Sequence, residues 1–299
     1  MSGPAVLALA PRDVAALREG REAELADART ALVDCFTAGP RAVLVRGLDP
    51  AALGEDAFAD CVLRIGGWLG TPSPQSPQCE RVARVEHVPD DAQRRGTHSD
   101  SELVAHTDLH DVLALACVRA AQQGGDSFLV SAGDLHDRLV RSAPHHLPAL
   151  SQGGFMGTNP VLRSREPVSR EPVPVFLPEP GATRMQCCAN GYFLRMGAQA
   201  RGQDLPEALV VALDALKAAA AELARSRAFR LEPGEILLWH NWSWLHGRTA
   251  FVDAPDQRRL LLRLWLRSAI VPRDARLADL ARRIDADHEL THQLGLRVA

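Results

Sequence analysis

The alternating segment from Arg258 to Arg267 constrains the fold of this chain more than any other feature of the sequence. Every second residue from Leu260 to Leu266 is leucine, which predicts a β-strand with one buried face. The opposite face carries three arginines, a leucine and a tryptophan: Arg259, Leu261, Arg263, Trp265 and Arg267. This second face fits either a solvated surface or the lining of a barrel. In a barrel, buried guanidinium groups need anions to offset their desolvation, and two arginines four residues apart, roughly 13 Å along a strand, could serve two different anions.

A second feature is the triplet His106-Thr107-Asp108. Side chains two residues apart share one face of an extended segment, so His106 and Asp108 can point at the same ion. His246, from a distant segment, would complete a set of two histidines and one carboxylate. Such a set leaves one side of an Fe(II) ion open for other ligands. The triplet alone is weak evidence, and the sequence after His246 strengthens it.

These motifs occur together with Gly124-Gly125-Asp126-Ser127, Asn241 and Leu245-His246-Gly247-Arg248. In this order and at these spacings, the chain resembles the taurine dioxygenase and clavaminate synthase superfamily, from about Val43 to Arg267. The resemblance implies an iron(II)- and 2-oxoglutarate-dependent oxygenase on a double-stranded β-helix, or jelly-roll, core. It also implies the cofactor set of Fe(II), 2-oxoglutarate as cosubstrate and O2.

The resemblance also implies roles for individual residues. His106, Asp108 and His246 match the iron ligands, and Arg259 matches the arginine that pairs with the far carboxylate of 2-oxoglutarate. Ser127 stands where the family often has a threonine that helps to hold the same carboxylate. Arg263 matches a position that in some members binds an acidic group of the substrate. We therefore expect hydroxylation or desaturation of a small polar substrate with an acidic group, such as an amino acid or a natural-product intermediate.

Asp108 also bears on the type of reaction. Related halogenases have a small residue in the carboxylate position, which frees a site for chloride. The carboxylate of Asp108 fills that position, so the resemblance implies oxygen insertion rather than halogenation.

Two other functions remain open on the residues alone. His106 and His110 are four residues apart, which on a helix would allow a zinc site of a hydrolase, although Thr107 stands where zinc metalloproteases have a glutamate. We expect His110 to lie behind the metal ligands or in the substrate pocket. His240 is a rival to His246 as third ligand, but the flanking residues favour His246. A barrel that only binds a small ligand is the other alternative.

Composition excludes several classes of partner. A net charge of −3 over 299 residues gives no reason to expect nucleic acid or an anionic membrane. The six cysteines lack C-x-x-C spacing, which indicates the reduced thiols of a cytoplasmic protein. Residues 1–11 do not have the pattern of a signal peptide, and no apolar run reaches membrane-spanning length. We expect a small molecule as substrate, and the sequence does not specify the oligomeric state.

The order of elements predicts one α+β catalytic domain over residues 1–299. It would comprise an N-terminal part (1–80), a jelly-roll core with flanking helices (about 81–270) and a C-terminal helix (271–299). Periodicity predicts a long helix over 13–36 and an outer, surface-packed helix over 274–295. Asn190-Gly191 predicts a hairpin between strands 184–188 and 192–195. A second strand pair is predicted over 229–231 and 236–239.

Other polar segments are harder to assign. The segment 89–101 precedes the metal triplet and is predicted to be a lid. Arg163, Arg165 and Arg170 lie in an irregular region that could contribute to the pocket, although a solvated loop is the simpler interpretation of each. The histidines without a nearby carboxylate are predicted to lie on the surface; these are His145, His146, His288 and His292.

Overall fold

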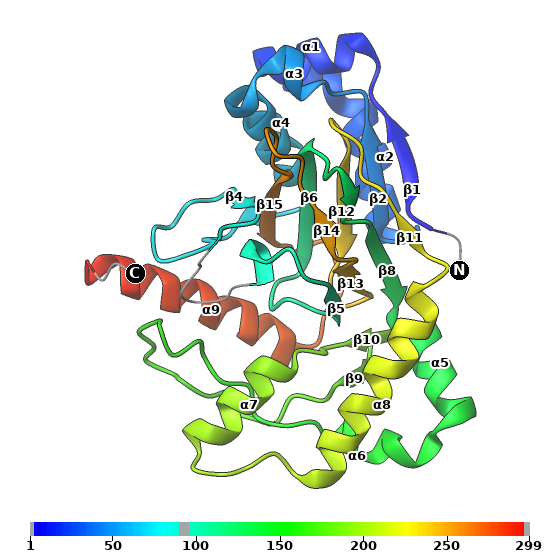
Figure 1. The fold of residues 1–299 in the computed structure, drawn as a ribbon, viewed down its shortest axis with the longest axis vertical. Coiled ribbons are helices and arrows are strands. Elements are labelled where there is room, and N and C mark those ends of the chain that lie inside the picture. Colours follow the sequence, from blue (N-terminus) through cyan, green and yellow to red (C-terminus); the bar gives the residue numbers. More distant parts are fainter. Residues whose placement is uncertain (1–2, 90–95, 296–299) are drawn as a thin grey trace.

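Two β-sheets form the centre of the molecule in the computed structural model, which describes residues 3–89 and 96–295 (Figure 1). The larger sheet has the strand order β1 (Ala5–Ala8), β2 (Ala42–Arg46), β12 (Ile236–His240), β6 (Val112–Arg119), β15 (Leu260–Arg267) and β3 (Thr71–Pro72), with β4 (Ala83–Val85) also paired to β15. The pair β1–β2 is parallel, and the other pairs in this sheet are antiparallel. The strand predicted from the leucine stripe is therefore an inner strand of the main sheet.

The smaller sheet has the order β11 (Ala228–Phe229), β8 (Ser127–Ser131), β13 (Trp244–Arg248) and β5 (Leu103–His106). Beside it lie the pairs β7 (Gln123–Gly124) with β14 (Phe251–Val252) and β9 (Phe176–Pro178) with β10 (Met185–Cys187). Leu129 and Trp244 of the smaller sheet pack in one cluster with Leu113, Trp239 and Leu261 of the larger sheet. The two sheets thus face each other across a shared interior, as predicted for the core.

The pairing predicted for 229–231 and 236–239 is wrong. Strand β11 pairs with β8 in the smaller sheet, whereas β12 lies between β2 and β6 in the larger sheet. The turn at Pro233-Gly234 therefore carries the chain from one sheet to the other. Local turn signals show that the chain reverses, but they do not show which sheet receives the next strand.

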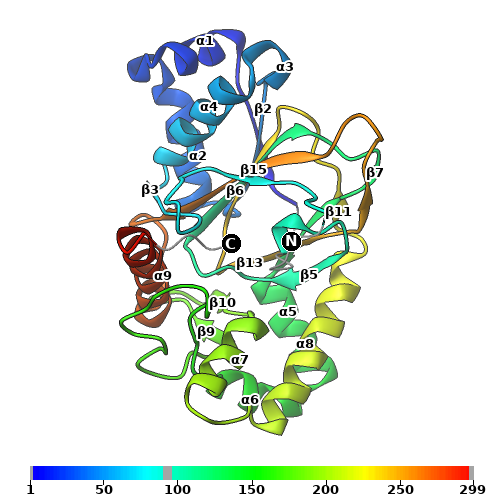
Figure 2. The same cartoon turned by 60° about the vertical axis from the view of Figure 1, so that its left-hand side comes forward.

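The N-terminal helices cover the outer face of the larger sheet (Figure 2). They are α1 (Pro11–Glu19), α2 (Ala26–Thr37), α3 (Pro50–Leu53) and α4 (Glu55–Gly67). The continuous helix predicted over 13–36 is wrong, because Gly20 takes a left-handed conformation (φ 70°) that ends α1. A short 3-10 turn then leads into α2.

Helices α5 (Ala132–Ser142), α6 (Leu147–Gln152) and α8 (Glu207–Ala224) bury the outer face of the smaller sheet. The predicted hairpin around Asn190-Gly191 is wrong: β10 pairs with β9, and Gly191 begins helix α7 (Gly191–Ala200). The side chain of Asn190 accepts a hydrogen bond from the backbone N–H of Phe193 and so caps this helix. Asn-Gly favours a tight hairpin turn, but asparagine is equally favoured as a helix N-cap.

The C-terminal helix α9 (Ala275–Gln293) packs against the body of the molecule through a largely polar face. The helix predicted over 274–295 is present and packs on the outside of the molecule, but the surface assignment of His288 is wrong, because this side chain is only 6% exposed. His288 Nδ1 bonds the carbonyl oxygen of Pro74, and His292 Nδ1 bonds that of Pro77. Hydrophobic periodicity detects the apolar part of this face, Leu277, Leu280 and Ile284, but not the buried polar side chains beside it. Within the described part of the chain, no helix has the length and apolar character needed to cross a membrane.

Candidate active site

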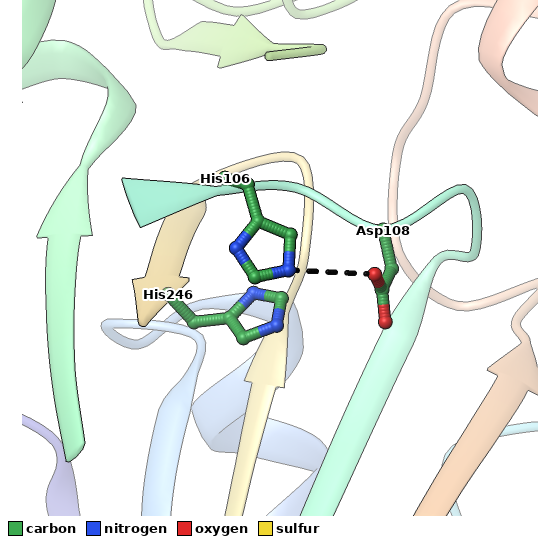
Figure 3. Close-up of side chains that lie close together, drawn as sticks. All are labelled: His106, Asp108 and His246. Carbon is green, nitrogen blue, oxygen red and sulfur yellow. Dashed lines mark ion pairs between the residues drawn. The ribbon is translucent and has the colours of Figure 1, made fainter. Parts of the chain in front are cut away.

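Two histidines and one aspartate meet where β5 and β13 lie side by side (Figure 3). His106 is the last residue of β5 and stands directly across the ladder from His246 of β13. Asp108 follows two residues later, with its Oδ1 3.6 Å from His106 Nε2. One ligand atom from each of the three residues can be chosen so that all lie within 4.8 Å of one another. The structure therefore brings together the three residues predicted as metal ligands.

Hydrogen bonds to neighbouring segments fix the triplet. The buried Thr107 bonds Ala189 twice: its N–H donates to the carbonyl oxygen at 3.1 Å, and its Oγ1 accepts from the N–H at 2.9 Å. The Asn241 side chain accepts from the N–H of Asp108 at 3.0 Å and donates to the carbonyl oxygens of Asp108 and His110 at 2.7 and 2.8 Å. These bonds hold the backbone on both sides of Asp108.

Electrostatics favour the protonation states that metal binding requires at His246 and Asp108, but not at His106. Burial, with the nearby charge of His106, lowers the pKa of His246 to about 3, so this imidazole is neutral at pH 7. Burial acts to raise the pKa of Asp108, but the hydrogen bond with His106 and the charges of His246 and Arg263 outweigh it and lower the pKa. Burial acts to lower the pKa of His106, but the interactions with Asp108 raise it overall, so a metal ion bound at Nε2 would take the place of a proton shared with Asp108.

The ring nitrogens of His106 have separate partners. Nδ1 lies 2.9 Å from the carbonyl oxygen of Val104, which can only accept, so this nitrogen carries a proton in the neutral ring. Nε2 is then left with its lone pair on the side of Asp108. A metal ligand held by a hydrogen bond at its other nitrogen is a common arrangement in metalloproteins. The donor set therefore fits a divalent metal ion.

The triad lies in a cavity of about 1430 Å³. Four residues of the second face of β15 line this cavity: Arg259, Leu261, Arg263 and Trp265. Of the two interpretations of this face, the barrel lining is correct for these four. Arg267, at the end of the strand, instead pairs with Asp285 of α9 at 2.6 Å.

Arg259 is 4% exposed, and burial lowers its pKa. Its guanidinium lies 5.0 Å from the ring of Phe251 and makes no hydrogen bond or ion pair with any residue that the structure describes. Ser127 of β8 is also buried and lines the same cavity. A buried guanidinium without an anion is costly, so this end of the cavity is suited to a carboxylate.

Arg263 lies closer to the triad than the sequence could indicate. Its Nε donates to Gln75 Oε1 at 3.0 Å, and its guanidinium lies 4.0 Å from the centre of the Trp265 ring. Nη1 is 3.9 Å from Asp108 Oδ2. Arg263 therefore contributes to the electrostatics of Asp108 as well as to the cavity wall.

His110 and His240 lie apart from the triad. His110 is fully buried behind Trp265, with ring centres 4.6 Å apart, and its Nε2 lies 3.0 Å from Asp285. The helical His106–His110 pair considered for zinc is wrong, because residues 107–111 are not helical. His240 bonds Ser243 Oγ at 2.6 Å and does not join the metal-binding group.

Several contacts in the site were not predicted. Trp265 Nε1 donates to Asp108 Oδ2 at 2.8 Å, and Trp239 packs against His246 with ring centres 4.8 Å apart. Arg248 is buried, and its guanidinium donates to the backbone carbonyl oxygens of Gly96, Ser99, Asp100, Ser101 and Thr249. Its position two residues after His246 was the only available signal.

Other predictions concern the surroundings of the cavity. Part of the predicted lid, residues 90–95, lies outside the described residues, and Arg248 holds the described part that follows it. Arg163, Arg165 and Arg170 are exposed and do not line the cavity of the triad.

Comparison with known proteins agrees with this geometry. Residues 12–265 match the model of a family described as taurine catabolism dioxygenase TauD, TfdA family. The chain belongs to this family. The match includes all seven residues singled out in the sequence as ligands or as cosubstrate or substrate contacts, and it confirms the resemblance.

Curated relatives and solved structures extend the comparison. FR-33289 synthase of Streptomyces rubellomurinus (strain ATCC 31215) is 29% identical over 217 residues, which are 68% of this chain and 61% of the relative. A uridine-5'-phosphate dioxygenase of Amycolatopsis sp is 26% identical over 78% of this chain and 82% of that protein. An asparagine oxygenase structure with Fe(II), hydroxyasparagine and succinate has a TM-score of 0.64 and 23% identity, covering 86% of this chain and 84% of its own. The oxygenase OrfP with Fe has a TM-score of 0.61 and 16% identity over 89% and 94%. These two likenesses show a shared fold.

Proposed function

We propose that this protein is an Fe(II)- and 2-oxoglutarate-dependent oxygenase that hydroxylates a C–H bond of a small substrate bearing an acidic group. The observation that carries the proposal is the pairing, in one cavity, of a two-histidine, one-carboxylate group with a buried and unpaired Arg259. A binding protein has no need of both features. Family membership and the names of the relatives support the same activity.

His106, Asp108 and His246 would hold the iron. When bound, Fe(II) would activate O2 with 2-oxoglutarate as the electron donor, so that one oxygen atom enters succinate, CO2 is released and the other oxygen atom enters the substrate. The chain's own contribution begins with the neutral His246 and the ionised Asp108, which need not lose a proton to bind the metal.

Arg259 and Ser127 would bind the far carboxylate of 2-oxoglutarate. A guanidinium can form two parallel hydrogen bonds with a carboxylate, which sets the direction of the cosubstrate as well as its affinity. Leu113, Leu115 and Leu261 line the same cavity and make its wall less polar. A drier surrounding strengthens the pair, because the effective dielectric constant is lower there.

An acidic group of the substrate would bind near Arg263 and Gln75. Gln75 is 6% exposed and lines the cavity, and its Nε2 has no hydrogen-bond partner among the described residues. Its Oε1 already holds Arg263, so the free amide N–H groups remain to donate to a carboxylate or phosphate. The cavity exceeds the roughly 300–1,000 Å³ of ordinary small-molecule sites, which leaves room for cosubstrate and substrate together.

The test is an anaerobic titration of metal-free protein with Fe(II) and then 2-oxoglutarate, followed by visible absorption. We expect a weak charge-transfer band that requires both additions and is absent in His246→Ala. Arg259→Ala should still bind Fe(II) but need far more 2-oxoglutarate for the band. The exposed neighbour Arg258 provides the matched control, and Arg258→Ala should behave as wild type.

Two outcomes would contradict the proposal. If the wild-type protein bound Fe(II) no better than His246→Ala, the assignment of the metal site would be wrong. A band without succinate release above the level of His246→Ala, over a panel of amino acids and phosphorylated small molecules, would favour a barrel that only binds its ligands.

A further inference from the structure

The indole of Trp265 contacts a predicted metal ligand directly. Its Nε1 donates to Oδ2 of Asp108 at 2.8 Å, whereas Oδ1 of the same carboxylate lies 3.6 Å from His106 Nε2. The two carboxylate oxygens therefore have different partners. Oδ1 is directed toward His106, and Oδ2 toward the indole, with Arg263 Nη1 farther away at 3.9 Å.

The position of the indole is determined from several sides. Trp265 stands opposite Leu113 in the pairing of β15 with β6. The ring of His110 stacks on it, with an interplanar angle of 13°. The Arg263 guanidinium lies over the ring, and the ring of His288 is nearly parallel to it at 6.4 Å. Because the backbone and ring are both held, the N–H direction is fixed as well.

The support behind the indole reaches helix α9. His110 Nε2 lies 3.0 Å from Asp285, which also accepts a hydrogen bond from Ser73 Oγ at 3.1 Å and forms an ion pair with Arg267, whose Nε is 2.6 Å away. His110 is fully buried, and the Asp285 side chain is 4% exposed. A continuous set of contacts thus runs from α9 through His110 and Trp265 to Asp108.

We propose that Trp265 is a positioning residue that holds Asp108 by Oδ2, so that Oδ1 alone is presented to the metal. A carboxylate free to turn can bind a metal through both oxygens, which would occupy a coordination position needed by the cosubstrate. A hydrogen bond from an N–H to an ionised carboxylate is strong enough to oppose that rotation. This inference rests on the proposed function, since it assigns Asp108 as a ligand.

A purely structural role for the ring is the competing explanation. Trp265→Phe separates the two, because phenylalanine keeps an aromatic ring against His110 and removes the N–H. Trp239→Phe is the matched control: Trp239 also packs on a predicted ligand, His246, but its buried Nε1 has no partner in the described structure. Both variants replace an indole beside a ligand, and one of them removes a hydrogen bond.

The experiment is a titration of the metal-free proteins with Co(II) alone, which reports affinity and, through its visible spectrum, the ligand geometry. We expect the dissociation constant of Trp265→Phe to rise about 10- to 100-fold and its spectrum to change. Trp239→Phe should keep the wild-type spectrum and an affinity close to wild type. The melting temperatures of the metal-free proteins show whether each variant is folded.

The outcomes separate this inference from the proposed function. Wild-type affinity and spectrum in Trp265→Phe would overturn the inference and leave the metal site intact. If the wild-type protein bound Co(II) no better than His246→Ala, the metal site itself, and with it the proposed function, would be contradicted.

If Trp265→Phe does not fold, the wild-type protein answers the question by NMR of its five indole N–H groups. Trp239→Phe identifies the resonance of the other indole beside a ligand, and a further resonance, that of Trp265, should be protected from hydrogen exchange and should shift on addition of Zn(II). Five indole resonances that are unmoved by Zn(II) would overturn the inference.

Discussion

Asn241 is a buried amide that contacts no predicted substrate or cofactor group and still determines where Asp108 lies. Its side chain bonds the backbone of Asp108 twice and that of His110 once. Asn241→Asp keeps the acceptor but replaces the donor with an oxygen that faces two carbonyl groups. We expect a loss of about 3 kcal/mol in the free energy of unfolding, measured in urea, together with weaker Fe(II) binding. Unchanged values of both would show that the backbone is held by other contacts.

Gln75 offers a test of the substrate site. Gln75→Glu keeps an acceptor for Arg263 and puts a negative charge where we expect the acidic group of the substrate. We predict a higher KM for the substrate, a smaller change in kcat and an unchanged affinity for 2-oxoglutarate. An unchanged KM would place the acidic group elsewhere in the cavity.

His240 predicts a pH dependence of stability. Burial, with the charges of Arg41, Arg273 and Arg184, lowers its pKa from 6.5 to about 3. Between these values the unfolded chain takes up a proton that the folded protein does not. The contribution of His240 to stability is thus complete above pH 6.5 and is lost as the pH falls, at up to about 1.4 kcal/mol per pH unit.

His240→Asn should therefore show a shallower decrease in unfolding free energy between pH 7.5 and pH 5. Urea unfolding at the two pH values measures it, and the exposed His145→Asn is the control that should retain the wild-type slope. Equal slopes in all three proteins would contradict the assignment.

For individual residues, the sequence was informative where the residue types and their order match a known motif. His106, Asp108, His246 and Arg259 could be singled out because their types and order are characteristic. The bond from Trp265 to Asp108 joins residues 157 positions apart, and its existence depends on strand register and side-chain direction. Neither can be derived from the pattern of one segment.

Among the elements, helix α7 lies in close backbone contact with the segment at Phe155. A Cβ added to Gly197 would lie 2.0 Å from the backbone oxygen of Phe155, so alanine there requires the helix to move. The first turn of α7, with Tyr192 and Phe193, lines the cavity. We predict that Gly197→Ala lowers the unfolding free energy by about 1–3 kcal/mol and raises the KM of the substrate, with Fe(II) affinity retained.

Gly191→Ala is the matched control on the same helix. A Cβ at Gly191 would meet only the side chain of Arg195, at 3.6 Å or more, and alanine favours a helix. This variant should be at least as stable as wild type in the same unfolding experiment. A similar loss of stability in both variants would mean that α7 tolerates no added methyl group at all.

The strand with strict alternation was predicted well, whereas the two strand pairs assigned from local turn signals were not. The stripe of β15 was assigned correctly because four leucines on one face leave a single consistent interpretation. Asn190-Gly191 was assigned to a hairpin because the same two residues suit a turn and a helix start. In the folded chain, Asn190 also donates from Nδ2 to the carbonyl oxygen of Thr107 at 2.9 Å, a distant contact that the local pattern does not contain.

For the molecule as a whole, the prediction of one catalytic domain has a calorimetric consequence. Both sheets contribute to one interior cluster, and the buried Arg41–Glu179 ion pair joins residues 138 positions apart. We expect a single unfolding transition in calorimetry. The peak should move to higher temperature as a single peak when Fe(II) and 2-oxoglutarate are added. A ligand at 100 times its dissociation constant raises the free energy of unfolding by about 2.7 kcal/mol. Two peaks, of which one responds to ligand, would show separate units.

Helix α9 holds two stretches of the cavity wall at once. His288 and His292 bond the loop at 74–77, and Thr291 Oγ1 accepts from the N–H of Arg163 in the segment that follows Asn159. The conformations of these two loops therefore depend on the same helix, and a substitution on the helix can alter both. A chimaera that receives one loop from another family member would lack the helix residues that hold that loop in place. To change the substrate preference of this protein, the loop and helix α9 would have to be exchanged together.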